Sequence, residues 1–321
     1  MKLKGIRWSH QFTLLLLIAV AFLVSVHMSR HFLDPAYLLT ATTNFVETGL
    51  MALAMTFVIL LGEIDLSVAS NLALTAALSG VLWAHFGWPL PVACMVGLVV
   101  SAVAGLANGL LVTRLKLPSL TVTLGSMALL RGAAQVLIGN QSITGFPDWF
   151  AGVDQRVVGP FPAITLLLLV AAVAWWAVLT RTIRGRMTQA TGANRAAARL
   201  SGISVEAITV RVFMVSGLMA GFCGLIMMSR VGAARWDMAQ GRELDVITAV
   251  VLGGTDIAGG EASIPGTMLA LILIAVMRTG MGLAEINPET QHVAVGILLA
   301  ASIAIPNLLR MRNGQKAQPA K

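Results

Sequence analysis

Three polar stretches interrupt an otherwise apolar chain of 321 residues, and they hold the side chains whose types and spacing could do chemistry. The first stretch, residues 62–70, reads G-E-I-D-L-S-V-A-S and sets the carboxylates of Glu63 and Asp65 beside Ser67. Polar groups inside a bilayer are costly and usually functional. Asp65 or Ser67 is expected to cap the helix that follows, because a side-chain oxygen can accept from its free N–H groups. Capping leaves Glu63 unexplained.

The second stretch belongs to a basic loop, residues 181–206, in which residues 191–203 read T-G-A-N-R-A-A-A-R-L-S-G-I. Asn194 is a good N-cap, the Ala-Arg-Leu run favours helix, and Gly202 is a good stop signal. The pattern predicts a short helix between two apolar segments. The alternative is a positively charged topology anchor. An anchor needs no structured helix, however, whereas a rigid helix suits docking into a partner.

The third stretch, residues 252–267, reads L-G-G-T-D-I-A-G-G-E-A-S-I-P-G-T. Its paired glycines, Gly253 with Gly254 and Gly259 with Gly260, let backbones pack closely or turn where a Cβ atom would clash. The alternative is a plain loop between helices. Against that alternative, the stretch adjoins an apolar segment that is too short to cross a membrane unaided.

The composition excludes a soluble globular protein. Hydrophobic residues make up 57% of the chain and charged residues 11%, with a mean hydropathy of +0.84, whereas soluble proteins are about 25% charged. Continuous apolar runs favour a helical bundle over a β-barrel, whose strands would alternate apolar and polar residues. The net charge of +8 lies in short blocks between apolar runs. This placement is typical of topology signals rather than of nucleic-acid binding.

The residue types that usually support catalysis or metal binding have no suitable spacing in this chain. The five histidines form no HExxH-like pattern, and Cys94 and Cys223 lie in apolar runs, where we expect them to be packing residues. The chain also has no GxxxxGK[ST] loop for ATP. We therefore expect no catalytic residue, no metal site and no cofactor bound by this chain.

The apolar segments predict an all-α polytopic membrane protein with about ten membrane elements in a single domain, residues 1–321. The element at residues 246–255 is short, so it is either re-entrant or completed by buried neighbours. Most of the 22 Lys and Arg fall on one side if both termini are cytoplasmic, which predicts an N-in, C-in orientation. The first segment could pass for a signal peptide, but no small-x-small site follows it, so we expect an uncleaved helix. The expected elements are residues 8–29, 44–62, 66–84, 89–113, 119–138, 161–179, 208–228, 246–255, 263–280 and 292–309.

Small and polar residues also occur inside the expected helices. Gly105-x3-Gly109 and Gly217-x3-Gly221 have helical spacing, which predicts close packing between helices. Arg131 must face protein or water rather than lipid, and it is either structural or part of a transport path. The polar residues that could line a translocation path are Asn71, Asn108, Arg131 and Gln135.

The three stretches, in their order along the chain, resemble the permeases of ribose/galactose-type ABC importers, which take up monosaccharides. In that family the motifs read G-G-I-D-L-S-V-G-S, G-x-N-x-x-A-A-R-x-S-G-I and V-V-L-G-G-T-x-x-x-G-G-x-G-x-x-x-G-T. The family's P-x-x-x-x-T-L-G-T-M and L-R-G are matched here by Pro118, T-L-G-S-M at residues 123–127 and L-R-G at residues 130–132. The likeness covers nearly the whole chain.

The chain departs from the family pattern at three glycine positions, which hold Glu63, Ala69 and Ala262. The resulting form G-E-I-D-L-S-V-A-S looks most like the permeases of rhamnose-type importers. The resemblance thus points to L-rhamnose as the substrate. Ribose, another pentose or hexose, or an autoinducer-2-like sugar are the alternatives.

The resemblance implies a multi-pass permease of the bacterial inner membrane that pairs with a copy of itself or with a related chain; the rhamnose-like form favours a related chain. A separate ATP-binding subunit, carrying ATP and Mg²⁺, would meet the inner face. A periplasmic sugar-binding protein would meet the outer loops at residues 139–160, 231–245 and 282–291. The short helix after Asn194 would be the coupling helix. The residues implied in coupling are Gly192, Asn194, Arg195, Ala198, Arg199, Ser201 and Gly202, and those implied in the motif structure are Glu63, Asp65, Ser67, Gly253, Gly254, Gly259 and Gly260.

Two other classes of function are weaker on these residues. An ion-coupled secondary transporter usually places an ionisable group in the middle of the membrane, and the acidic residues here fall near helix ends. An intramembrane enzyme needs a nucleophile with a base, or a set of metal ligands, and no such spacing occurs. Dependence on ATP distinguishes the importer from the ion-coupled transporter, and product formation distinguishes it from the enzyme.

Overall fold

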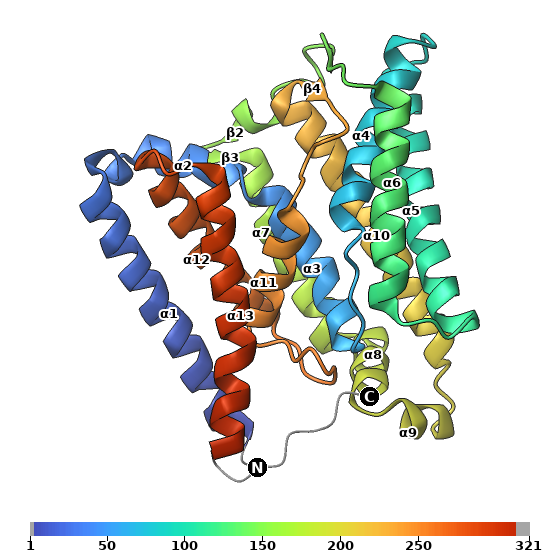
Figure 1. The fold of residues 1–321 in the computed structure, drawn as a ribbon, viewed down its shortest axis with the longest axis vertical. Helices are drawn as coiled ribbons and strands as arrows, with labels where there is room; N and C mark the ends of the chain where they lie inside the picture. Colours follow the sequence, from blue (N-terminus) through green and yellow to red (C-terminus); the bar gives the residue numbers. More distant parts are fainter. Residues whose placement is uncertain (1–2, 313–321) are drawn as a thin grey trace.

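The computed structural model describes residues 3–312, and the chain folds into a bundle of helices with a few very short strands (Figure 1). The helices are α1 (Leu3–Met28), α2 (Pro35–Thr43), α3 (Val46–Leu60), α4 (Val68–Ala84), α5 (Leu90–Arg114), α6 (Ser119–Ile138), α7 (Ala163–Arg181), α8 (Ile183–Ala193), α9 (Arg195–Leu200), α10 (Val205–Val231), α11 (Arg242–Leu252), α12 (Ile264–Leu283) and α13 (Pro288–Arg312), with 3-10 turns η1 (Arg30–Leu33) and η2 (Val153–Gln155). The strands are β1 (Ile143–Thr144), β2 (Val157–Val158), β3 (Phe161–Pro162) and β4 (Ala233–Ala234).

The bundle has two distinct ends. Helices α8 and α9 lie at one of them, here called the α9 end, and the labelled strands lie at the other, here called the β end (Figure 1). The start of α1 and the end of α13 both lie at the α9 end, together with the basic loop. The assignment of the α9 end to the cytoplasm stays a prediction from the distribution of cations.

Six helices in the described part of the chain are long and apolar enough to cross a membrane: α1, α5, α6, α7, α10 and α12. Helices α2 and α3, which are bent by 49° at a short break, would make a seventh span if they are counted together. The remaining predicted elements correspond to α4, α11 and α13, which are not among these spans. The helical membrane fold is therefore confirmed, while the count of about ten elements stays a prediction.

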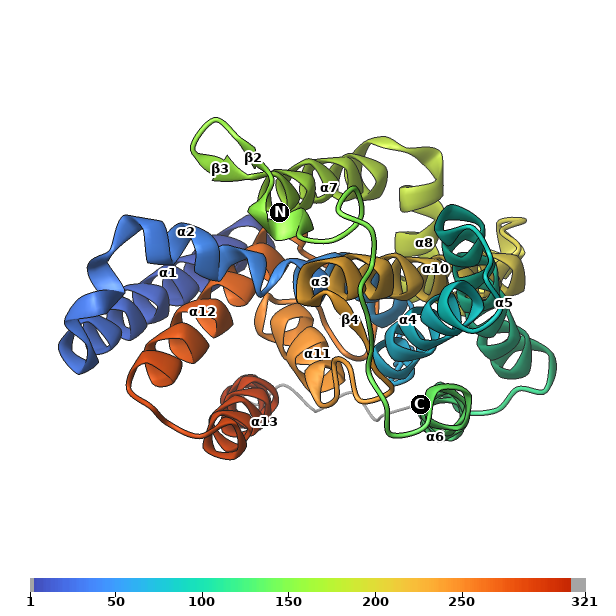
Figure 2. The same ribbon diagram turned by 90° about the horizontal axis from the view of Figure 1, so that it is seen from above.

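Helix α10 organises the bundle because it packs against α3, α4 and α5. Seen from above, α1, α12 and α13 lie on one flank and α5 and α6 on the other, with α3, α4 and α10 between them (Figure 2). The predicted glycine contacts are confirmed. A Cβ atom on Gly105 would lie 2.3 Å from the Phe213 carbonyl oxygen, and one on Gly217 would lie 2.9 Å from the Gly105 Cα. Helices α5 and α10 thus touch backbone to backbone, as small-xxx-small pairs allow.

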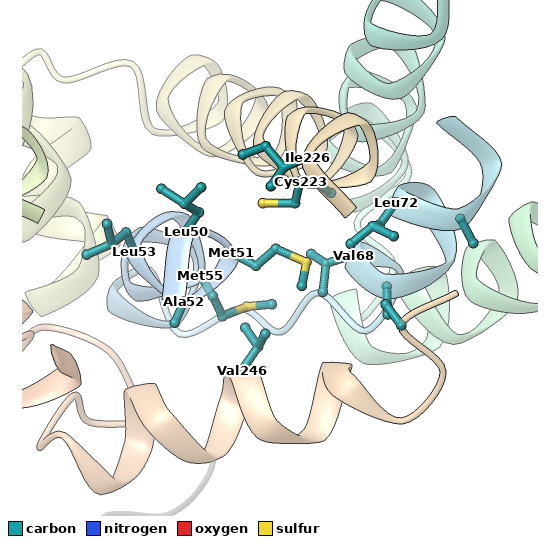
Figure 3. Packing of buried hydrophobic residues seen from close by; sticks show 14 of the residues in the cluster. Leu50, Met51, Ala52, Leu53, Met55, Val68, Leu72, Cys223, Ile226 and Val246 are labelled. Atoms are coloured by element: carbon teal, nitrogen blue, oxygen red, sulfur yellow. The ribbon is translucent and has the colours of Figure 1, made fainter. Parts of the chain in front are cut away.

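Helix α3 forms the core, and all fifteen of its residues are buried. Figure 3 shows Met51 and Met55 of α3 lying between Val68 of α4 and Val246 of α11. Cys223 of α10 is fully buried against the same helix and packs with this cluster, which confirms its expected role. A helix that is enclosed on every side has little contact with lipid, so its polar residues need partners within the protein.

Helix α11 corresponds to the short eighth element, and together with the segment that follows it, up to Gly260, it runs along α3. At its start, the Arg242 guanidinium donates to the Asn44 carbonyl oxygen at 2.9 Å, beside the first turn of α3. Beyond its end, the Gly260 N–H donates to the Leu60 carbonyl oxygen at 2.9 Å, at the last turn of α3. The segment therefore passes from the β end to the α9 end and does not turn back. This course agrees with the predicted alternative in which buried neighbours complete a short element. Helix α11 is not among the helices long and apolar enough to cross a membrane, so its crossing stays a prediction.

Candidate functional site

The predicted short helix in the basic loop is confirmed as α9. The Asn194 Oδ1 accepts from the Ala197 N–H at 3.0 Å and so caps the helix, and Gly202 follows its end with a positive φ of 78°. Gly202 adopts this left-handed conformation at little cost because it has no Cβ. The preceding helix α8 was not predicted; Thr182 caps it by accepting from the Gly185 N–H at 3.1 Å.

The first and second polar stretches meet through Arg195 at the α9 end. Its guanidinium donates to the Leu61 carbonyl oxygen at 2.8 Å and forms a close ion pair with Glu63. The Glu63 side chain is 10% exposed and the Arg195 side chain 41%. Glu63, which capping could not explain, thus anchors the start of α9 to the turn that follows α3.

The third stretch, residues 252–267, contacts the same end of α3 through its glycines. A Cβ atom on Gly192 would lie 2.0 Å from the Leu60 carbonyl oxygen, and one on Gly259 would lie 2.9 Å from the same oxygen. Gly260, at a φ of +90°, approaches Ala193 so closely that a Cβ would lie 3.1 Å from its Cα. We call the contact of Leu60, Gly192, Gly259 and Gly260 the glycine junction. It brings three segments that are distant in sequence into direct backbone contact.

Gly253 and Gly254 lie at the other end of the third stretch and serve a separate contact. A Cβ on Gly253 would lie 2.4 Å from the Thr267 nitrogen, so the end of α11 packs directly against the first turn of α12. Gly254 has a φ of +90°, which turns the chain away from α11. The glycine pairs therefore provide close packing at two different points.

The opposite side of α9 faces outward. Ala198 is buried, but Leu200 is 91% exposed. Arg199 forms an ion pair with Glu206 at 2.6 Å in which both side chains are about half exposed. The outer side of α9 and the first turn of α10 therefore present one large apolar and two charged side chains at the end of the bundle.

Asp65 and Ser67 lie just before α4, at the centre of a buried polar network. The Asp65 Oδ1 accepts from the Ser67 hydroxyl at 2.6 Å, and the other carboxylate oxygen accepts from the Ser216 hydroxyl at 3.0 Å. Asn108 donates to the Ser67 hydroxyl oxygen at 3.0 Å and accepts from Ser126. The predicted capping is found one residue before α4, where the Asp65 Oδ1 accepts from the Ser67 N–H at 3.0 Å, whereas no side-chain cap bonds the N–H groups of α4 itself. The network instead links α4, α5, α6 and α10.

The four residues predicted for a translocation path do not come together. Asn71 is buried between helices, where it donates to the Ser101 carbonyl oxygen at 3.1 Å, and Asn108 belongs to the network described above. Gln135 is exposed on α6. Arg131 donates to the carbonyl oxygens of Trp236 and Met238 at 2.7 and 2.8 Å, so it holds the segment before α11.

Replacing Arg131 by Leu is expected to loosen the segment at residues 235–241 and to lower stability by about 2–3 kcal/mol, because two carbonyl oxygens lose a charged donor. Hydrogen exchange of this segment and the thermal unfolding temperature would measure the effect. Arg131→Lys keeps a charged donor with several hydrogens and should lose less. Unchanged exchange in Arg131→Leu would show that the two bonds do not hold the segment.

A cluster of buried charges at the β end was missed in the sequence. Glu47, in the first turn of α3, is fully buried and accepts from Arg230 at 2.8 Å, with Arg242 3.8 Å away. Asp245 of α11 accepts from Arg278 of α12 at 2.7 Å. The signal was present, because ionisable residues inside or beside apolar segments need partners, but the sequence does not say which.

A cavity of about 260 Å³ opens beside these charges. It lies between α2, α3, α11, α12 and α13, and Arg242, Asp245 and Arg278 line it together with polar and aromatic side chains. Two of the three predicted outer loops, residues 139–160 and 231–245, meet at the same end, since β1 pairs with β4 in antiparallel register, Ile143 opposite Ala234. In the second of these loops, the hydrogen bond from Arg235 lowers the pKa of Asp237.

The fold and the site define a multi-pass helical membrane protein of the transport type. The short helices α4 and α11 adjoin irregular segments that are enclosed by other helices, as in transport proteins rather than simple anchors. A model of the family described as "branched-chain amino acid transport system / permease component" matches residues 37–303. The chain belongs to this permease family.

Individual relatives agree with the resemblance seen in the three motifs. The ribose import permease protein RbsC of Bacillus subtilis (strain 168) is 35% identical over 293 residues, which cover 90% of each chain. The RbsC protein of Haemophilus influenzae is 36% identical over 266 residues, covering 81% of this chain and 82% of the relative. The autoinducer 2 import system permease protein LsrD of Klebsiella pneumoniae is 32% identical over 309 residues, covering 94% and 92%. No solved structure matches the chain significantly.

Proposed function

We propose that this chain is the membrane-spanning permease subunit of a bacterial ATP-driven monosaccharide importer in the inner membrane. Its family and the import permeases among its relatives support this function. The observation that carries the proposal is the contact of Arg195 with Glu63 and the Leu61 carbonyl. This contact ties an exposed helix to the core helix α3, as an energy-coupled transporter requires.

In this proposal α9 is the coupling helix and binds the ATPase. Leu200 and Arg199 lie on its exposed side and would meet the partner, while Ala198 packs inward. ATP binding closes the two nucleotide sites of the ATPase, with ATP and Mg²⁺ held there, and moves α9. The displacement reaches α3 and the segment before α12 through the glycine junction.

The movement must then reach the spans that surround the substrate. Glu63 is two residues from Asp65, whose carboxylate bonds Ser67 of the α4 N-terminus and Ser216 of α10. A shift of the turn after α3 therefore acts on α4 and α10 at once. Buried polar groups need a hydrogen-bond partner in every conformation. A network of this kind therefore favours two discrete arrangements over a continuous range of intermediate ones.

Three partners follow from the proposal. The ATP-binding subunit docks at the α9 end, and a periplasmic sugar-binding protein docks at the β end on residues 139–160, 231–245 and 282–291. The pairing of β1 with β4 supports a common docking surface for the first two loops. A second permease, which is a copy or a related chain, completes the membrane part.

The substrate is a monosaccharide. The names of the relatives support ribose or autoinducer 2, whereas the form G-E-I-D-L-S-V-A-S supports L-rhamnose. We take L-rhamnose and ribose as the two sugars to compare directly, since other pentoses and hexoses would compete with the preferred one.

Uptake of labelled L-rhamnose or ribose into proteoliposomes is expected to require ATP when this chain is assembled with its ATPase, its binding protein and any partner permease. An ATP-free preparation and one treated with an ionophore are the controls. Uptake that follows an ion gradient without ATP would overturn the importer. ATP turnover without uptake of either sugar would retain the transporter class and reject these substrates.

An ion-coupled transporter is the second candidate, and one observation favours it. The carboxylates of Glu47 and Asp245 are buried within the bundle, and intramembrane carboxylates are common coupling sites. Each of them is already paired with an arginine, however, so an internal cation takes the place that a coupling ion would occupy. The ionophore control separates this candidate from the ATP-driven importer.

A further inference from the structure

The cavity at the β end is lined by charged groups that are already held in place. The Asp245 carboxylate is buried and accepts from Arg278 at 2.7 Å. The Arg242 guanidinium donates to the Asn44 carbonyl oxygen at 2.9 Å and to the Thr48 hydroxyl at 3.4 Å. All five residues line the cavity. Donors and acceptors that are fixed before binding lower the entropic cost of ordering a ligand.

The charges select the chemical class of the ligand. An isolated anion in the cavity would meet the carboxylate of Asp245, and an isolated cation would meet the guanidinium groups of Arg242 and Arg278. Behind the wall, Glu47 offsets Arg230 and Arg242 in the same way. A hydroxyl group both donates and accepts, so several hydroxyl groups on one ligand can satisfy both kinds of partner at once. The lining thus favours a neutral polyhydroxylated ligand.

The size and the apolar part of the lining agree with a single sugar ring. The cavity has a volume of about 260 Å³, below the range of about 300–1,000 Å³ that is typical of sites for drug-sized ligands. Tyr37, Ala41 and Phe45 contribute aromatic and apolar surface beside the charges. A sugar ring presents C–H faces as well as hydroxyl groups, and this mixed lining is complementary to both.

We propose that this cavity is a monosaccharide-binding site of the permease itself, in which Asp245 accepts from sugar hydroxyl groups and Arg242 and Arg278 donate to them. The site deepens the proposed function and rests on it for the identity of the sugar. The sugar would bind there, at the β end, after it leaves the binding protein and before it enters the interior of the bundle. A transporter needs weak binding at such an intermediate site, because a tightly bound sugar would not be released into the rest of the transport path.

The proposal is tested on the purified full-length chain in lipid nanodiscs, with no ATPase present. D-ribose and L-rhamnose are added separately, and hydrogen exchange is followed together with ligand-observed saturation-transfer NMR. Sucrose serves as the size control, because a disaccharide exceeds the cavity. One of the two monosaccharides is expected to slow exchange at residues 37–48, 242–252 and 278–291, and sucrose is expected to leave these segments unchanged.

Two variants localise the binding. Ala41→Leu fills the cavity and Asp245→Asn removes the carboxylate charge while keeping the shape, and each is expected to weaken sugar binding at least about tenfold, the effect of losing one good polar contact. Ala107→Leu, which adds the same bulk on the exposed side of α5, is the matched control and should bind as the unmodified chain does. The protection pattern of the unmodified chain tests the site even where a variant fails to fold.

Three results would overturn the site. Sugar binding that survives both Ala41→Leu and Asp245→Asn would place the sugar elsewhere. Protection of the three segments by inorganic phosphate rather than by either sugar would make the cavity an anion site. Absence of protection by a sugar that the assembled transporter does take up would reject the site while the proposed function stands, whereas failure of ATP-dependent uptake is a separate result that rejects the function.

Discussion

Arg195→Glu is expected to reduce ATP-dependent sugar uptake more than tenfold while the chain remains folded. The substitution sets a carboxylate against Glu63 and removes the donor to the Leu61 carbonyl, so the start of α9 loses its anchor to α3. Breaking a buried ion pair costs about 3–5 kcal/mol, but the Arg195 side chain is 41% exposed, and solvent screening reduces the cost to about 1–2 kcal/mol. The variant is therefore expected to stay folded, while a movement of α9 no longer reaches α3.

The swapped pair provides the control for this prediction. Arg195→Glu combined with Glu63→Arg restores opposite charges at the same place and is expected to recover part of the uptake. ATP turnover and uptake are measured separately in proteoliposomes, since a lost linkage should leave turnover while uptake falls. Normal uptake by Arg195→Glu alone would show that the ion pair takes no part in coupling.

Gly192→Ala is expected to destabilise the chain by at least about 3 kcal/mol, the upper part of the range for overpacking. The new Cβ would lie 2.0 Å from the Leu60 carbonyl oxygen and 3.0 Å from the Gly260 nitrogen. Both neighbours are backbone atoms, so no side chain can swing aside to make room. The three segments of the glycine junction would have to separate, and the yield of monodisperse protein in detergent and its unfolding temperature would both fall.

Gly132→Ala is the matched control for the glycine junction. Gly132 lies within α6, and nothing lies within 4 Å of the position that its Cβ would take. Alanine is favoured over glycine in a helix by roughly 0.5–1 kcal/mol, so this variant should be as stable as the unmodified chain or slightly more stable. Equal losses of unfolding temperature in both variants would contradict close packing at Gly192.

Local signals in the chain were enough to predict most of the elements. The apolar run that begins after Pro118, with Arg131 as its one charged residue, predicted residues 119–138, and α6 has these same bounds. Asn194 and Gly202 bracket α9 as an N-cap and a stop signal should. These predictions succeed because the length of an apolar run and the chemistry of a helix end act within a few residues. Helix α2 was missed, although the Asp34 side chain caps it and Pro35 begins it.

The sequence did not predict which distant residues interact with one another. The sequence does not show that Glu63 and Arg195 are partners, and only the packing of α8 against α3 brings them together. The same holds for Arg131, whose partners lie in the segment before α11, and for the buried charges at the β end, whose partners lie on other helices. Composition and local pattern establish the membrane class and the order of the helices, because burial in lipid is a property of each segment. Ion pairs, backbone contacts and cavities depend on how segments far apart in the chain are packed together, and that is decided in the tertiary structure.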